Sequence, residues 1–160
     1  MRYTITVPTL ADGIAVDRVA GRAIVTTLSN TDDTFSAPGP ALVYVIDEGR
    51  GRLLRTLAMA AGPNAGSARS VVMQAAVDER RGQAFVIAQE LAYGPSVAAV
   101  EGGSVTVLET RIGRTVRTIA VGKGAVAVAV AGRVGRVFVT NADDGTVSVL
   151  DAHVAGVGMR

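Results

Sequence analysis

The chain of 160 residues is 49% hydrophobic but only 4% aromatic, so it can form one domain with an aliphatic core. It has no cysteine and a single histidine, which excludes disulfides, thiolate metal sites and histidine-based metal clusters. Its formal net charge of +2 is too small to indicate nucleic acid by itself. We therefore expect a globular domain with no nucleic acid partner and no cofactor.

The beginning of the chain resembles neither an export signal nor a membrane segment. Residues 1–10 lack a basic stretch followed by an apolar run, and the longest apolar run, residues 125–131, has the length of a strand. We expect no membrane partner, and these patterns leave the compartment unknown.

An internal repeat sets the architecture. Residues 1–27 align without a gap on residues 115–141, so that Val25, for example, corresponds to Val139. A fixed period of this kind indicates one supersecondary unit that is stacked several times.

Three copies of the unit follow one another along the chain, and each predicts short strands. The first strand ends at residues 14–17, 75–78 and 128–131, the second covers residues 22–26, 83–87 and 136–140, the third covers residues 41–47, 103–109 and 145–151, and the fourth covers residues 52–59 and 114–121. Valine-rich segments of alternating polarity, separated by Gly, Asp and Asn, are typical of antiparallel strands joined by tight turns. No segment has the period and caps of a helix, so the sequence predicts an all-β fold.

A glycine at a fixed place marks the turn between the first and second strands of each copy. These glycines are Gly21, Gly82 and Gly135. In the third copy, Gly145 ends the next turn, where a positive φ is expected.

The few aromatic residues of the predicted strands are expected in the core. They are Tyr44, Phe85 and Phe138.

The order of the strands predicts a circular permutation. The third copy stops after its third strand, and residues 1–7 match residues 115–121, which form a fourth strand. We therefore expect residues 1–7 to complete the last sheet, which gives three four-stranded sheets per chain. The other expected units are residues 12–59, 69–121 and 124–151, followed by a tail of residues 152–160.

The third copy resembles a known repeat family. Phe138-Val139-Thr140-Asn141, followed by residues 145–151, is similar to the YVTN-type β-propeller repeat, in which a Tyr-Val-Thr-Asn strand leads through a short turn to a Thr-Val-Ser-Val-Ile-Asp strand. Residues 119–124 resemble the family's approach to each new sheet, or blade. The resemblance implies a β-propeller with a binding role, suits an extracytoplasmic protein, and carries over no catalytic residue.

Three blades do not close a propeller, for which four to eight are typical. Sheets left open would expose valine-rich edges that are prone to pairing. One solution is a homodimer, which closes a six-bladed ring with a strand exchanged at each seam. The alternative is a fragment of a longer propeller. The complementary ends of the chain favour the homodimer.

The predicted connections differ between the two ends of the sheets. One end has only brief turns, whereas residues 27–40, 60–70 and 88–102 form long insertions at the other end. Insertions that collect at one end of a repeat protein are typical of a binding face. The candidate binding residues on this long-loop face are Asn30, Asp32, Asp33, Phe35, Asn64, Gln89, Glu90 and Tyr93.

Other interpretations of these residues stay open. Their oxygen atoms could hold Ca²⁺, but the spacing of a calcium loop is absent, and Asp32 and Asp33 are more simply interpreted as turn residues. We therefore predict no metal site. Asp32 and Glu90 would form an acid–base pair only if the fold brings them together.

The end with the brief turns is rich in arginine. Its arginines are Arg18, Arg22, Arg50, Arg52, Arg80, Arg81, Arg111, Arg114, Arg133 and Arg136. A ring of arginines is one hypothesis for binding phosphate or an anionic polymer, but acidic residues at the same strand ends favour local ion pairs. His153 is interpreted as a solvated side chain in the tail.

The leading functional hypothesis is a non-catalytic binding or scaffold module that presents the long-loop face to a protein, peptide or glycan. The second is a propeller hydrolase of lactonase type with a divalent cation at the mouth of the channel, for which the candidates are Asp32, Asp33, Asn64 and Glu90. The third is a fragment of a larger propeller without independent function.

Overall fold

The computed structural model describes residues 4–7, 10–27, 41–60, 69–93 and 98–153. Within these ranges the protein consists of antiparallel strands and turns without a helix, which confirms the all-β prediction. It follows that the described ranges also contain no helix long and apolar enough to cross a membrane.

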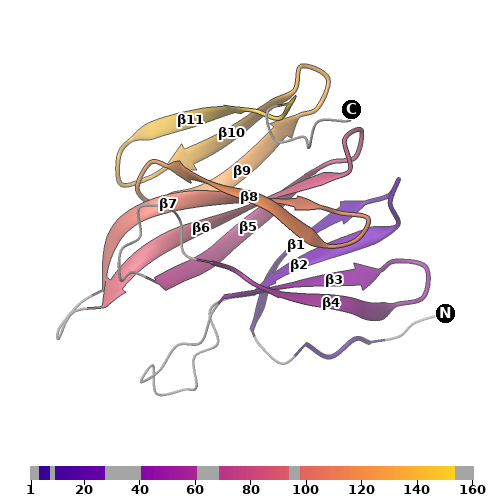
Figure 1. The fold of residues 1–160 in the computed structure, drawn as a ribbon. Coiled ribbons are helices and arrows are strands. Elements are labelled where there is room, and N and C mark those ends of the chain that lie inside the picture. The colour runs from indigo at the N-terminus through magenta and orange to yellow at the C-terminus, as the bar shows by residue number, and fades with distance from the viewer. Residues whose placement is uncertain (1–3, 8–9, 28–40, 61–68, 94–97, 154–160) are drawn as a thin grey trace.

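The strands of the described residues form three antiparallel sheets (Figure 1). The first sheet contains β1 (Ala11–Asp17), β2 (Arg22–Thr27), β3 (Leu42–Asp47) and β4 (Arg52–Ala58), the second contains β5 (Arg69–Asp78), β6 (Gln83–Tyr93), β7 (Ala98–Glu109) and β8 (Arg114–Val121), and the third contains β9 (Ala125–Ala131), β10 (Arg136–Asn141) and β11 (Thr146–Asp151). Each sheet is a meander in which every strand pairs with its neighbour in sequence.

The turns repeat with the same geometry because a glycine in each adopts positive φ. Gly21, Gly82 and Gly135 have φ values of 65°, 62° and 65°. The carbonyl oxygen of each glycine accepts a hydrogen bond from the backbone N–H of the residue after the third strand of its sheet, and these donors are Glu48, Thr110 and Ala152. The repeated hydrogen bond fixes which positions of the three sheets correspond. Gly145 has the expected positive φ as well, at 62°.

Two layers of mainly aliphatic side chains hold the sheets together. The layer between the first and second sheets contains Ile24, Val43, Val45, Val72, Val86 and Leu108. The layer between the second and third sheets contains Phe85, Ile87, Val105, Val107, Val137 and Val139. Alternate residues of β6 serve the two layers, because successive side chains of a strand point to opposite faces.

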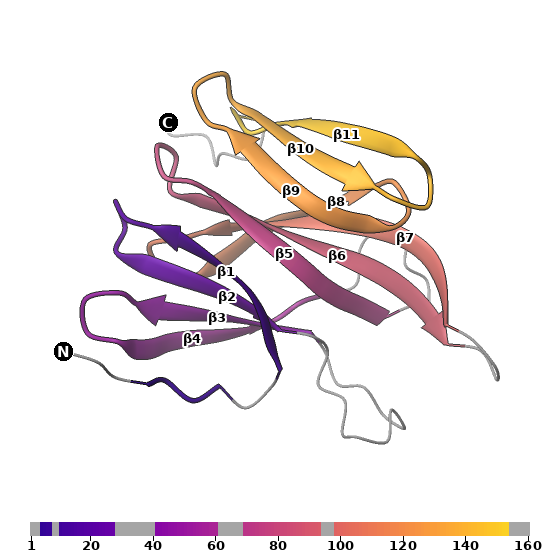
Figure 2. The ribbon, with the colours of Figure 1, turned by 180° about the vertical axis from the view of Figure 1, so that it is seen from behind.

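The first strand of each sheet lies on one side of the molecule. Figure 2 shows β1, β5 and β9 together on this side, and β5 contacts both of the others. The second sheet therefore has a neighbour on each face, whereas the first and third sheets each have one face on which no other sheet of the described residues packs. We call these two faces the outer face of the first sheet and the outer face of the third sheet.

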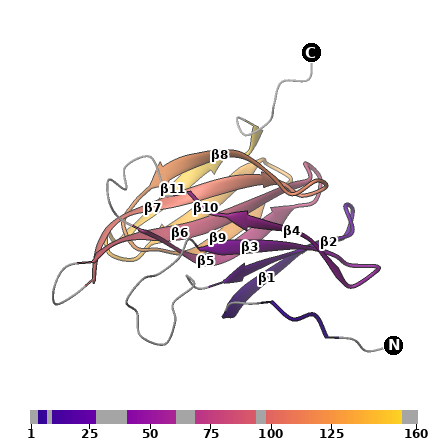
Figure 3. The same cartoon turned by 60° about the horizontal axis from the view of Figure 1, so that its bottom comes forward.

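Within this chain, the N-terminal segment does not complete the third sheet as expected. Residues 4–7 belong to no sheet, and β11 pairs with β10 as the last strand of a three-stranded sheet in the described part of the chain. Instead, Ile5 and Val7 pack against Val25, Tyr44 and Ile46 on the outer face of the first sheet. Figure 3 shows this segment on the side of the molecule opposite β11. Two apolar side chains are thereby covered without a strand partner.

The expected loop of residues 88–102 is instead mostly a hairpin. β6 continues to Tyr93 and β7 begins at Ala98, so that Gln89 pairs with Gly103 and Tyr93 pairs with Ala98. β5 extends the same region, since Arg69 pairs with Leu91. The extension satisfies backbone hydrogen bonds that a loop would leave to water, and the adjacent polar residues Gln89 and Glu90 hide the alternation in the sequence.

One of the three strand aromatics departs from its predicted place. Tyr44 and Phe85 are buried as expected, but the side chain of Phe138 lies on the outer face of the third sheet, where the residue is 38% exposed. Phe138 lies in a strand, as predicted. It is uncovered because no sheet of the described residues packs on that face of the third sheet.

Candidate functional site at the short-turn end

Aspartates end the first strands of two sheets and hold the turns that follow. Asp17 ends β1, and its Oδ1 accepts a hydrogen bond of 2.8 Å from the backbone N–H of Ala20. Asp78 ends β5, and its Oδ1 accepts from the backbone N–H groups of Arg80 and Arg81 at 3.1 and 3.3 Å. Short acidic side chains favour such turns because they bond the backbone of the next few residues.

Asp17 also joins the first sheet to the second. Its Oδ2 accepts a hydrogen bond of 2.5 Å from the hydroxyl of Thr110, and both residues are fully buried. Thr110 begins the turn after β7. Exposed charged residues of the short-turn end surround this buried hydrogen bond.

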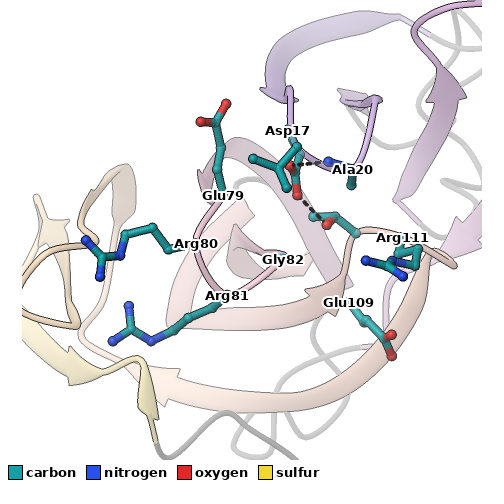
Figure 4. A pocket seen from close by; sticks show the side chains of 10 residues that line it. Asp17, Ala20, Glu79, Arg80, Arg81, Gly82, Glu109 and Arg111 are labelled. Carbon is teal, nitrogen blue, oxygen red and sulfur yellow. Dashed lines mark hydrogen bonds between the residues drawn. The ribbon is translucent and has the colours of Figure 1, made fainter.

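A polar cavity of about 320 Å³ lies beside this bond, between the first and second sheets (Figure 4). It is lined by Asp17, Val19, Ala20, Glu79, Arg80, Arg81, Gly82, Glu109, Thr110 and Arg111. Its residues come from the turns β1–β2, β5–β6 and β7–β8. We refer to it as the short-turn cavity.

The carboxylates of the short-turn cavity are already engaged with other groups. Glu79 accepts a hydrogen bond of 3.1 Å from the backbone N–H of Arg18, whose guanidinium lies 3.9 Å away. Glu109 pairs with Arg114 at 3.1 Å. Asp17 accepts hydrogen bonds from Ala20 and Thr110, so each of the three carboxylates of the cavity already has a partner.

Two arginines of the cavity are not neutralised in this way. Arg80 and Arg111 are exposed, and among the described residues neither forms an ion pair. Arg80 also lines a neighbouring cavity of about 370 Å³, which Arg133 borders from the β9–β10 turn. In Figure 4 the side chains of Arg80 and Arg111 lie on opposite sides of the short-turn cavity. The cavity thus has two arginines without an ion-pair partner among the described residues.

Arg81 has a different role, since it connects the second and third sheets. Its Nη1 donates to Oδ2 of Asp78 at 2.7 Å and to the carbonyl of Gly132 at 2.9 Å. Its Nη2 lies 2.6 Å from Nε2 of His153, whose Nδ1 lies 3.0 Å from Oδ1 of Asp151. The neutral imidazole with its proton on Nδ1 satisfies both contacts of the ring.

The interpretation of His153 as a solvated side chain in the tail is therefore corrected. Its ring is 63% exposed, but it is held between Arg81 and Asp151. The contact depends on Gly135, because a Cβ at that position would overlap the imidazole of His153.

Two aspartates at the ends of third strands have lowered pKa values. The backbone N–H of Arg50 is the main cause for Asp47, and the nearby Arg22 also lowers its pKa. Hydrogen bonds from the backbone of His153 and from the side chain of Arg136 lower the pKa of Asp151 to about 2. The hydrogen bonds that each carboxylate accepts stabilise its ionised form, which lowers its pKa.

Local ion pairs account for several arginines at this end, as the sequence indicated. The pairs are Arg22–Asp47, Arg81–Asp78, Arg114–Glu109 and Arg136–Asp151, with the longer contact Arg18–Glu79. The sequence did not distinguish Arg80 and Arg111, which form no ion pair among the described residues, from these paired arginines. Thr110 carried no signal at all, since its partner Asp17 lies 93 residues away in sequence.

None of the predicted long-loop residues that the structure describes lines this cavity. Asn30, Asp32, Asp33, Phe35 and Asn64 lie outside the described residues. Gln89, Glu90 and Tyr93 are strand residues of β6 rather than loop residues.

Glu90 is an unusual member of the core. It is 1% exposed, and its Oε1 has no hydrogen-bond partner. It lies on the same face of β6 as Val86 and Ala88, which pack toward the first sheet. A Cβ on the paired Gly102 would lie 3.0 Å from Oε2 of Glu90. Within the described ranges, no three His, Asp or Glu side chains are grouped to hold a metal ion.

Comparison with known proteins does not identify this site. No protein-family model and no curated protein sequence matches the chain.

Proposed function

We propose that the chain is a non-catalytic binding module of β-propeller type, and that its short-turn cavity binds a carboxylate group of a protein or peptide. The observation that carries the proposal is the pair Arg80 and Arg111, which flank a cavity whose own carboxylates are already engaged. An acidic side chain bound in the cavity would gain charge-assisted hydrogen bonds from both arginines without displacing an existing ion pair if Arg80 turned inward, since Figure 4 shows its guanidinium pointing away from Arg111.

The lining of the cavity favours a carboxylate over nucleic acid. Binding of single-stranded nucleic acid combines positive charge with aromatic side chains on which bases stack. The residues of the short-turn cavity include no aromatic. A volume of about 320 Å³ is also at the small end of ligand pockets, so it suits one or two side chains of a longer peptide.

The repeated sheets support the propeller part of the proposal. Two four-stranded sheets and one three-stranded sheet, with the same glycine turns, are stacked with their first strands on one side, as blades are in a propeller. The long-loop face remains a second predicted binding surface of the module. The hydrolase and the fragment remain sequence-based alternatives.

The proposal is tested by binding of a fluorescent peptide rich in glutamate, measured by anisotropy at several salt concentrations. We expect binding that weakens with salt and is absent for the same peptide with glutamine. The double variant Arg80→Gln with Arg111→Gln should lose about tenfold or more in affinity, since a hydrogen bond to a charged group contributes about 1.5–3 kcal/mol.

Arg50→Gln is the matched control, because Arg50 lies in the β3–β4 turn at the same end but does not line the cavity. It should bind the peptide like the unmodified chain. Equal affinity for the glutamate and glutamine peptides would contradict the proposal, as would an unchanged affinity of the double variant.

A further inference from the structure

The outer face of the third sheet exposes a continuous set of apolar side chains. Phe138 of β10 is 38% exposed, and Val147 and Val149 of β11 are each 56% exposed. Phe138 and Val149 are direct cross-strand partners, so they form one surface.

The same positions of the second sheet are completely buried. The turn glycines Gly82 and Gly135 align β6 with β10 and thereby Phe85 with Phe138. Phe85 pairs with Val107 as Phe138 pairs with Val149. Phe85 is 1% exposed and Val107 is fully buried, because the third sheet covers them. The outer face of the third sheet thus has apolar residues at the same positions as the covered face of the second sheet, but no sheet of the described residues covers it.

The outer face of the first sheet has the surface that would cover it. Val25 corresponds to Val139, which packs against Phe85 and its neighbours in the layer between the second and third sheets. An apolar groove of about 320 Å³ lies on this outer face, and it is lined by Ile5, Val7, Ala11, Asp12, Gly13, Ile14, Val25 and Ile46. By the repeat, this groove is where the equivalent of Phe85 belongs.

The N-terminal segment has the place of a fourth strand beside that groove. Ile5 and Val7 correspond to Ile119 and Val121 of β8. Ile119 and Val121 pack into the layer against the third sheet, and Ile5 and Val7 pack in the same way on the first sheet, where Val25 is a common neighbour. By the repeat, residues 4–7 are the fourth strand of a sheet. They lie on the first sheet, and no three strands of the described residues stand beside them to complete that sheet.

We propose that a second copy of this chain supplies those three strands. Its third sheet would dock on the outer face of the first sheet, with Phe138 in the groove and β11 paired to residues 4–7. The same contact at the second seam would close the two chains into a ring of six sheets, within the usual range for propellers. The inference rests on the propeller part of the proposed function and is independent of the carboxylate site.

The register of the new pairing follows from the second sheet. Ser104 of β7 pairs with Ala120 of β8. The equivalent pair across the seam is Thr146 of one chain and Thr6 of the other, and both threonines are exposed in the single chain. Because the chain has no cysteine, two single-cysteine variants can test this pair directly.

The first experiment mixes the single variants Thr6→Cys and Thr146→Cys under mild oxidation. We expect a covalent heterodimer, because the two strands would face each other across the seam. A mixture of Thr6→Cys with Val147→Cys is the register control and should give much less product, since neighbouring side chains of a strand point to opposite faces. Absence of the heterodimer from the first mixture would overturn the proposal.

The second experiment measures solution mass by light scattering over a range of concentrations. We expect a mass twice the 16.3 kDa of one chain. Val149→Lys should reduce the dimer affinity by at least a hundredfold while the chain stays folded, because Val149 lies outside the core of its own chain. Ile112→Lys, at an exposed site in the β7–β8 turn, should remain dimeric.

A single-chain mass at every concentration would contradict the inference, and a mass that keeps rising would contradict the closed pair. Peptide binding by Arg80 and Arg111 is a separate readout. Loss of the dimer with retained binding, or the reverse, shows which of the two proposals has failed.

Discussion

At the scale of single residues, the acidic side chains of this protein differ in how fully they are hydrogen-bonded. Asp17, Asp78 and Asp151 each accept several hydrogen bonds, from turn backbone and from side chains. Glu90, within β6, is as buried as Asp17 and Asp78, but its Oε1 has no hydrogen-bond partner among the described residues. Asp151, whose pKa is lowered by the hydrogen bonds it accepts, should stabilise the fold in its ionised form.

Asp151 predicts a loss of stability in acid. The pKa of this carboxyl is about 2 in the folded chain and close to 4 when unfolded. Between these values the unfolded state binds more protons, so the free energy of unfolding falls as the pH is lowered from about 4 to about 2. Urea unfolding at several pH values should show this slope, and Asp151→Asn should make it shallower.

Asp12→Asn removes one exposed carboxylate from β1 and controls for the change in net charge. A slope that is the same in Asp151→Asn and in the unmodified chain would contradict the assignment of the lowered pKa to the contacts with His153 and Arg136.

Glu90 gives a prediction of the opposite kind. Glu90→Gln keeps the shape of the side chain and removes a group whose charge would be costly to bury without a partner. We expect the free energy of unfolding to stay the same or to rise by about 1 kcal/mol. Glu101→Gln, at an exposed position of β7, is the control for charge and should change little. A loss of several kcal/mol in Glu90→Gln would show that the carboxylate has a partner that matters.

At the scale of elements, each short turn is defined by its glycine, but the turns differ in what surrounds them. Gly21 and Gly135 have the same φ of 65°. A Cβ at Gly21 would meet nothing within 4 Å, whereas one at Gly135 would overlap the ring of His153. The two glycines therefore separate the backbone requirement from the packing requirement.

Alanine at these two glycines should have unequal effects. Gly21→Ala should cost about 1–2 kcal/mol in unfolding free energy, the usual penalty of positive φ for a residue with Cβ. Gly135→Ala should cost more, because it also displaces His153 from Arg81 and Asp151. Urea unfolding of both variants, alone and combined with His153→Ala, measures the difference. Equal losses would contradict the structural role of His153.

The strands show where pattern reading succeeds and where it stops. Valine-rich segments together with glycine turns predicted β1–β4 and β9–β11 within a few residues, because strand propensity and turn geometry are local properties of the sequence. The ends of β6 and β7 were missed. Their extension depends on pairing between Leu91 and Val100, which local polarity around Glu90 conceals.

At the scale of the whole molecule, the main feature is the difference between the middle sheet and the two end sheets. Phe85 and Phe138 occupy the same place in the repeat, yet only Phe85 is buried, because only the second sheet has neighbours on both faces. An exposed apolar face next to an open strand edge is a hazard for aggregation unless it is covered. The proposed second copy would cover both with surfaces that the chain already has.

The sequence alone determined the repeat, the all-β class, the glycine turns and the sequence match of residues 1–7 to a fourth strand. These follow from local rules, since alternation and positive φ act within a few residues. Only the tertiary structure decided that residues 4–7 rest on the first sheet, that Asp17 reaches Thr110, and that two arginines of the short-turn cavity, Arg80 and Arg111, form no ion pair among the described residues. Those outcomes depend on which sheets come together in space, and contacts between residues so far apart in the chain leave no periodic trace in it.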